Sequence, residues 1–194
     1  MRSGDATKSR IQKSALMLFV DNGVDGTGMR EIAKAAGITE GAIYRHFKGK
    51  DELVWALFAD SYQAYGEKLD ALQRGAVHTA AKLEAMVRGF CTFYDEDETL
   101  FRFLLLVQHG QLLKVTDAMR TPVDVVMDVI SDGIRAGHIT YKDASAATAA
   151  VLGIVLQTAT FKIYDRLPGP MHARADALVA ACQGAVGMKV SRKP

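Results

Sequence analysis

The sequence predicts an all-α protein in which a small N-terminal helical module precedes a larger helical body. The composition favours helix, since 49% of the 194 residues are hydrophobic and only four are proline. Apolar residues recur at helical spacing, and the alternation typical of strands is not found. Three short helical segments precede residue 50, whereas longer ones follow it.

The first helix is expected to extend from an N-cap at Thr7 to about Asn22, where Gly23 provides a stop signal. Its spacing predicts an inward apolar stripe of Ile11, Ala15, Leu18 and Phe19. A second helix is expected over residues 29–36.

Gly37 ends the second helix, and Thr39 is a suitable N-cap for a third that is expected to run to Phe47. Two short helices joined by a turn that contains glycine are typical of a helix-turn-helix. After residue 50, the apolar spacing and the turn residues predict helices over residues 51–73, 79–94, 98–114, 121–136, 143–164 and 171–187. Pro122 suits the first position of the fourth of these.

Charge is distributed unevenly along the chain. Residues 1–50 hold nine Lys and Arg against five Asp and Glu, although the whole chain has a net charge of only +2. This excess indicates a polyanion-binding end, and an ordinary solvated surface is the alternative. Cys91 and Cys182 have no metal-ligand spacing and are expected to be buried thiols in a reducing cytosol.

Two apolar stretches resemble targeting or membrane segments. Residues 15–20 are too few for the core of a signal peptide. Residues 144–161 carry no charge but contain several Ser, Thr and Gln side chains, which make a membrane span unconvincing. We therefore expect a cytoplasmic protein without a membrane partner, in which residues 144–161 form a helix buried in protein.

The third helix has two distinct faces on a helical wheel. Ile43 and Phe47 lie together and should face the other helices, whereas Gly41 and Arg45 point away. The missing side chain of Gly41 would allow close approach to base edges, and arginine reads guanine well. A solvated amphipathic helix that tolerates a glycine is the alternative interpretation.

The N-terminal part of the sequence resembles the TetR-type family of bacterial transcriptional regulators. The resemblance covers about the first 55 residues and rests on IQKSALMLFVDNG (11–23), MREIAKAA (29–36), GIT (37–39), GAIY (41–44), HF (46–47) and KDEL (50–53). It implies a DNA-binding domain over residues 1–50 and a ligand-binding and dimerisation domain over residues 51–194. It also implies a homodimer that leaves its operator when a small molecule binds.

By this resemblance, the DNA backbone is contacted from Thr39, Tyr44, His46 and Lys50, and the bases are met from Glu40, Gly41, Ala42 and Arg45. The neighbouring cation Lys48 is also expected to bind DNA. Lys50 also stands at a helix N-terminus, where a cation opposes the dipole unless a phosphate is bound there. The chain departs from the family in having Val24 for an aromatic residue and Gly28 for Ser or Thr, so Thr27 is expected to supply the phosphate-binding hydroxyl.

The resemblance further implies that the last two long helices pair with their twins in a four-helix bundle. Small residues in residues 144–161 and 173–187 favour such close contact, and an intrachain core is the alternative. Aromatic residues of the central helices are mostly core, but a subset is expected to line a pocket for a lipophilic or aromatic inducer. The candidates are Tyr62, Phe90, Tyr94, Leu105, Gln108 and His109.

We expect neither a metal site nor a catalytic site. Residues 21–32 faintly resemble a calcium loop, but Ile32 occupies the position that requires Glu. The histidines show no metal spacing and no nucleophile motif is present, so no catalytic residue, metal or cofactor is predicted. The sequence thus predicts a ligand-responsive transcriptional repressor. The alternatives are a helical small-molecule-binding protein without a DNA role and an enzyme with an aromatic-lined cavity.

Overall fold

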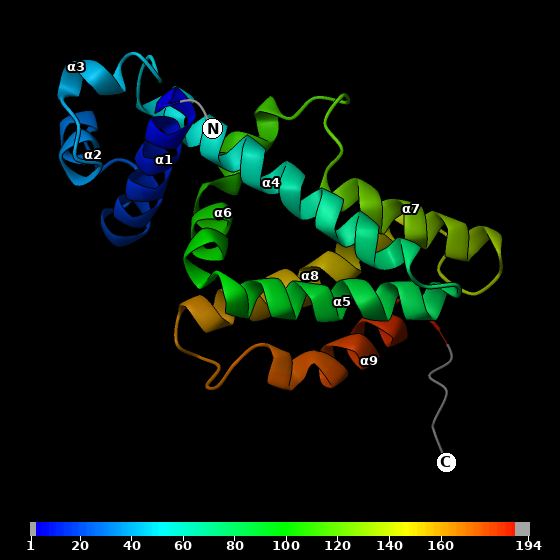
Figure 1. Cartoon of the computed structure of the whole chain (residues 1–194). Helices are drawn as coiled ribbons and strands as arrows, with labels where there is room; N and C mark the ends of the chain where they lie inside the picture. Colours follow the sequence, from blue (N-terminus) through cyan, green and yellow to red (C-terminus); the bar gives the residue numbers. More distant parts are fainter. Residues whose placement is uncertain (1–2, 189–194) are drawn as a thin grey trace. The chain divides into compact units, whose positions relative to one another are not determined.

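The computed structural model describes residues 3–188, and within this range the chain forms helices and loops without a strand. The all-α prediction is therefore confirmed. The α-helices are α1 (Ser3–Asn22), α2 (Met29–Ala35), α3 (Glu40–Ile43), α4 (Lys50–Arg74), α5 (Thr79–Glu96), α6 (Glu98–Gln111), α7 (Pro122–Arg135), α8 (Ala144–Ile163) and α9 (Ala175–Ala185) (Figure 1). Two short 3₁₀ helices, η1 (Leu112–Lys114) and η2 (His172–Arg174), follow α6 and precede α9.

These bounds match the predicted ones closely in the body and less well near the N-terminus. Helix α1 begins at Ser3, so Thr7 lies one turn inside it and the predicted N-cap is wrong. Asp5 in the first turn suits the helix dipole, which favours a helix that begins before Thr7. In the body, Thr121 caps α7 through a reciprocal capping box, and Pro122 is the first helical residue as predicted.

The described chain divides into two compact units. One contains residues 3–61 and 99–116, and the other contains residues 62–98 and 117–188. Helix α4 contributes its first part to one unit and its second part to the other. The functional boundary after residue 50 stays a prediction.

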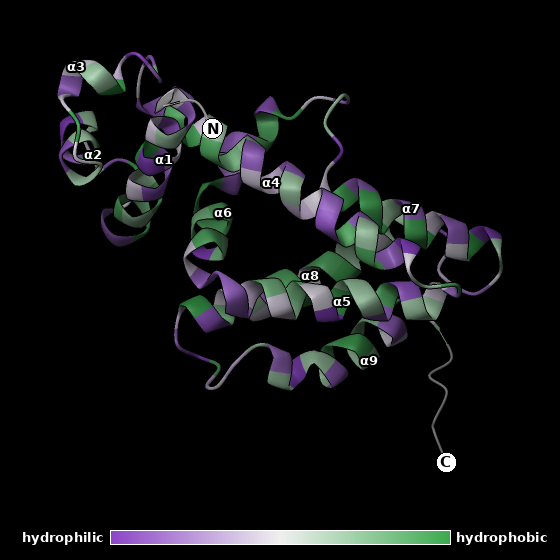
Figure 2. Ribbon diagram, in the orientation of Figure 1, coloured by the Kyte–Doolittle hydropathy of each residue, from purple (hydrophilic) through white to green (hydrophobic). Residues whose placement is uncertain are grey.

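The first unit is built around apolar residues from each of its short helices. Ile11 of α1, Ile32 of α2 and Ile43 of α3 are fully buried. Phe103 of α6 stacks on Phe19 of α1 with ring centroids 6.0 Å apart. Green and purple residues alternate along these helices in Figure 2, as expected for helices with one buried face.

The second unit is centred on α5, which contacts α7, α8 and α9 (Figure 1). Its buried face includes Leu83, Met86, Val87, Phe90 and Tyr94. Cys91 and Cys182 are buried, free thiols, as the sequence predicted. Burial raises the pKa of the Cys91 thiol to about 11 and that of the Cys182 thiol to about 12, so neither is a reactive thiolate at neutral pH.

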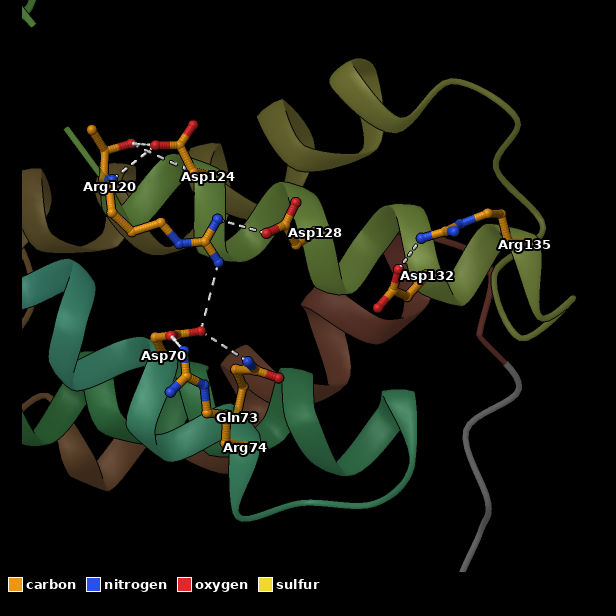
Figure 3. A network of polar contacts seen from close by, with 9 residues as sticks. Asp70, Gln73, Arg74, Arg120, Asp124, Asp128, Asp132 and Arg135 are labelled. Atoms are coloured by element: carbon orange, nitrogen blue, oxygen red, sulfur yellow. Dashed lines mark hydrogen bonds and ion pairs between the residues drawn. The ribbon is translucent and has the colours of Figure 1, made fainter. Parts of the chain in front are cut away.

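A polar network joins the second part of α4 to the start of α7 (Figure 3). Asp70 is buried and accepts hydrogen bonds from Gln73 at 2.9 Å and from Arg74. Arg120 lies 3.6 Å from Asp70 and 2.6 Å from Asp128, so it bridges the two helices. One turn before Asp70, the backbone of Gly66 lies directly against the backbone of residues 120–122.

Helix α8 has one buried and one open face within the chain. Val151, Val155 and Ala159 are buried, whereas Ala149 and Gly153 are exposed. The expectation that this helix is covered on every side is therefore not met by one chain alone. Among residues 3–188, α8 is the one helix long and apolar enough to cross a membrane. This is weak evidence for a span, because core helices of soluble proteins share these properties.

Candidate nucleic-acid interface

The turn between α2 and α3 is closed by backbone hydrogen bonds that require a glycine. Gly37 has φ +65°, a conformation that L side chains rarely adopt. Its N–H donates to the carbonyl of Lys34 at 3.1 Å, and the N–H of Ile38 donates to the carbonyl of Ala33 at 3.0 Å. This closure of α2 leads the chain directly into α3.

Helix α3 begins at a side-chain cap. Thr39 has extended backbone angles, and its Oγ1 accepts a hydrogen bond from the N–H of Ala42 at 3.3 Å. Such a cap stabilises a helix start by about 1 kcal/mol. The predicted N-cap is therefore confirmed, and because the oxygen acts as acceptor, the hydroxyl proton can still donate to a phosphate.

The α-helical part of this segment is shorter than predicted. Helix α3 ends at Ile43, and the N–H of His46 donates to the carbonyl of Ile43 at 2.9 Å in a tighter turn. The N–H of Phe47 still donates to the carbonyl of Ile43 at 3.0 Å, and the N–H of Lys48 donates to Glu52 Oε2 of α4 at 2.6 Å. Ile43 and Phe47 remain the two inward anchors, exposed by 0% and 2%.

The residues predicted to meet DNA lie on the outer side of this anchored segment. We call Glu40, Gly41, Ala42, Tyr44, Arg45 and His46 the reading surface, and each is exposed or half-buried. Tyr44 is 48% exposed although it is aromatic. A Cβ built on Gly41 would meet nothing within 4 Å. The outward orientation is thus as predicted, and the contact with DNA stays a prediction.

Thr27 requires a correction. Its side chain is 1% exposed, and its Oγ1 lies 2.8 Å from the carbonyl oxygen of Gly23 and 3.2 Å from that of Leu18. The hydroxyl therefore satisfies carbonyl groups at the end of α1 and does not face solvent, where a phosphate would bind. Gly28 is the N-cap of α2 and makes no side-chain hydrogen bond.

The two lysines that follow the reading surface have different environments. Lys48 is exposed. Lys50 is half-buried, and its Nζ donates to the carbonyl of Val24 at 2.7 Å and lies 3.4 Å from that of Asp25. Two loop carbonyls thus accept hydrogen bonds from the ammonium, whose charge opposes the dipole of α4.

Comparison with known proteins identifies the family. The model of bacterial regulatory proteins of the tetR family matches residues 11–57. The HTH-type transcriptional regulator TtgR of Pseudomonas putida is 41% identical over 177 residues, which cover 89% of this chain and 73% of that protein. The chain belongs to the TetR family.

Other similar regulators align over different extents. YttP of Bacillus subtilis (strain 168) is 34% identical over 101 residues, which make up 51% of this chain, so the chain spans about half (49%) of that protein's length. The crystal structure of the transcriptional regulator FadR from Bacillus subtilis, in complex with stearoyl-CoA, superposes with a TM-score of 0.81. At 19% identity over 92% of this chain and 97% of that one, this likeness concerns the fold alone.

The residues predicted to bind the ligand of this TetR-family chain fall into both compact units. Tyr62, Phe90 and Tyr94 belong to the second unit, whereas Leu105, Gln108 and His109 lie on α6 in the first. Phe90 and Tyr94 are buried. Burial, together with the charge of Asp124, raises the pKa of Tyr62 to about 12. A common pocket for these six residues stays a prediction.

One contact of an inward anchor could not be predicted from the sequence. Lys8 of α1 lies over the ring of Phe47, with its Nζ 5.8 Å from the ring centroid. Phe47 is 39 positions away along the chain, so no local spacing in the sequence relates the two residues.

Proposed function

We propose that the chain is a DNA-binding transcriptional regulator that represses its target and is released by a small molecule. The anchored, outward-facing reading surface in a chain of the TetR family is the observation that carries this proposal. Arg45 would read a base, and Tyr44, Thr39 and Lys48 would contact phosphates. As a protein that acts on chromosomal DNA, it would work in the cytoplasm.

The regulator would act as a homodimer held by α8 and α9. The open face of α8 carries small residues, and α9 likewise exposes Ala177, Ala180 and Gly184. A Cβ on Gly153 or Gly184 would meet nothing within 4 Å, so the chain itself gives no reason for these glycines. Close helix contact with a second copy supplies such a reason and supports the proposal. Two reading surfaces would then address two half-sites of an operator.

The inducer would be lipophilic or aromatic. Large apolar side chains dominate α5 and α6, and the fold is shared with a FadR whose crystal structure contains stearoyl-CoA. Binding of such a molecule would shift α4 and alter the spacing of the two reading surfaces. A long-chain acyl-CoA is therefore a suitable first probe. Release of DNA by small hydrophilic metabolites alone would contradict the lipophilic assignment.

A mobility-shift assay with the DNA that flanks the protein's own gene tests the function. We expect sequence-selective, salt-sensitive binding, and Arg45→Ala should weaken discrimination between operator and mutated operator. Ligand-dependent melting shifts without DNA binding would favour a small-molecule-binding protein that has no DNA role. Turnover of an aromatic or acyl substrate without DNA binding would favour an enzyme.

A further inference from the structure

Arg102 of α6 carries a buried donor that the described chain does not satisfy. Its Nε is buried and has no hydrogen-bond partner among residues 3–188. Glu98 lies one turn earlier on the same helix, at a spacing that favours an ion pair, yet it does not bind this nitrogen. By contrast, Arg88 and Arg120 each pair with two carboxylates.

The unsatisfied Nε of Arg102 calls for an acceptor from outside residues 3–188. A buried N–H of a charged group is unfavourable without an acceptor, because it has lost water and gained no partner. Most such groups in folded proteins are bound, so each exception requires an explanation. A guanidinium presents its donors in a planar fork that matches the oxygen atoms of a carboxylate or phosphate. An oxyanion is therefore the acceptor that fits Arg102 best.

An exposed apolar surface begins one turn after Arg102 and continues into η1. Leu105 and Leu106 follow Arg102 at i+3 and i+4 spacing, which places them on the same side of α6. Leu106 is 53% exposed, and Leu112 and Leu113 of η1 are 38% and 89% exposed. The segment from Leu105 to Leu112 extends about 10 Å along the helix. Large apolar side chains exposed along one short segment are typical of a binding surface.

We propose that Arg102 and this apolar surface bind an amphiphilic anion, in which a carboxylate or phosphate head group is joined to an apolar chain. The head group would accept hydrogen bonds from the guanidinium, and the chain would lie along Leu105 and Leu106 toward η1. All of these residues belong to the first compact unit. A small ligand is favoured over the surface of a second protein chain, because a small oxyanion can reach a donor that lies below the surface. The proposal rests on the proposed function, since it gives the chemical class of the inducer.

Binding to the DNA-free protein is measured with three probes that share one apolar chain. Laurate carries a carboxylate, lauroyl-CoA carries phosphates, and 1-dodecanol is uncharged. Titration calorimetry gives the three affinities. At least one charged probe should bind about tenfold more tightly than dodecanol, as expected for a charge-assisted hydrogen bond.

Variants of Arg102 assign this difference to its guanidinium. Arg102→Met keeps a long apolar stem and should weaken binding of the preferred charged probe about tenfold, while dodecanol binds as before. Arg102→Lys, which retains the charge without the fork, should restore part of the loss. Arg135→Met is the matched control and should change neither affinity, because the Arg135 side chain is 77% exposed and pairs with Asp132 on α7. A loss confined to laurate identifies a carboxylate head group, and one confined to lauroyl-CoA identifies a phosphate.

Thermal unfolding without a ligand gives a second readout. Arg102→Met should melt at the wild-type temperature or above it, because it removes a donor that has no acceptor. A clearly lower melting temperature would show that the folded chain itself satisfies Arg102 and would overturn the proposal. Equal weakening of charged and uncharged probes, binding of none of them, or a changed oligomeric state of Arg102→Met in sedimentation would do the same. If Arg102→Met does not fold, Arg102→Gln replaces it in every measurement.

These measurements need no DNA, so they decide the proposal even if the protein bound no operator and the proposed function failed. If the function holds, the preferred charged probe should release the operator, and Arg102→Met should require about tenfold more of it. Release by some other molecule, with none of the three probes bound, would leave the regulator intact and refute the anionic ligand.

Discussion

Gly41 of α3 and Gly66 of α4 are both helical glycines, yet their surroundings differ completely. A Cβ on Gly66 would lie 3.1 Å from three backbone atoms, of Arg120, Thr121 and Pro122, whereas a Cβ on Gly41 would meet nothing within 4 Å. Glycine inside a helix costs about 1 kcal/mol relative to alanine. Close backbone packing explains that cost at Gly66, while the chain offers no such explanation at Gly41.

The two regions also differ in how their charged groups are used. Around Gly66, the carboxylate of Asp70 and the guanidinium of Arg120 are engaged in the network that joins α4 to α7 (Figure 3). On the reading surface, Arg45 and Tyr44 are exposed. The network thus satisfies its polar groups within the chain, whereas the polar groups of the reading surface face solvent.

The largest effect is expected from Gly66→Ala. Because the new methyl group would press on backbone atoms that cannot rotate away, the free energy of unfolding should fall by about 2 kcal/mol. Urea denaturation monitored by circular dichroism measures this change. Gly110→Ala in α6 is the control, since the methyl group meets open space there and should not destabilise the fold. Equal stability of the two variants would show that the backbone contacts of Gly66 do not require a glycine.

Asp70→Asn should follow, with a loss of about 1.5 kcal/mol, because a buried carboxylate loses its charge-assisted hydrogen bonds. Asp132→Asn is the matched control on α7. Asp132 pairs with Arg135 on the same helix, and their side chains are 58% and 77% exposed, so the loss should stay below about 0.5 kcal/mol. Thermal unfolding of both variants compares the stability contributed by the network between two helices with that contributed by an ordinary surface ion pair. Equal losses would show that Asp70 contributes no more than a surface charge.

Gly41→Ala should stabilise the protein by up to about 1 kcal/mol through helix propensity and still weaken operator binding. The first change follows from the open space around Gly41, and the second from the loss of close approach to base edges. Denaturation and operator titration are performed on the same preparation. Unimpaired binding by Gly41→Leu, which is far bulkier, would show that the glycine has no role in recognition.

The smallest effect concerns acid stability in the second unit. Burial alone would raise the pKa of Asp95, but hydrogen bonds from the backbone N–H groups of His172 and Met171 and from the His172 ring outweigh it and lower that pKa. A carboxyl with a lowered pKa stabilises the fold above its ordinary value of 3.8, and this contribution is lost as the pH falls below it.

Asp95→Asn should therefore be less stable than the wild type at pH 7, by less than about 1 kcal/mol, and the difference should fade below about pH 4. Denaturation curves over this range measure it. A difference that persists unchanged to pH 2.5 would show that the ionised carboxylate is not responsible.

Helix positions in the body were predictable because their signals are local. Thr121 and Pro122 at the start of α7 form a cap and a first helical residue that need no tertiary information. The inward direction of Ile43 and Phe47 was also predictable, since it follows from helical spacing.

Other features could not be predicted because they depend on contacts between distant residues. After Ile43 the segment continues as a tighter turn, and the N–H of Lys48 then donates to Glu52 of α4. The residue type of Thr27 and the neighbouring Gly28 predict a hydroxyl that binds phosphate. In the structure this hydroxyl faces the carbonyl groups of Leu18 and Gly23. Residue type alone does not distinguish a hydroxyl that faces solvent from one that satisfies the backbone.

The way in which Ile43 and Phe47 anchor the reading surface has a consequence for evolution. Substitutions at exposed positions such as Glu40, Gly41 or Arg45 usually change stability by no more than about 0.5 kcal/mol, apart from the effect of replacing a glycine. With base contacts from these positions as proposed, new operator preferences would arise by single mutations that require no compensation in the core. Gene duplication followed by drift at these few codons would be enough to separate two regulatory circuits while both proteins keep the same fold.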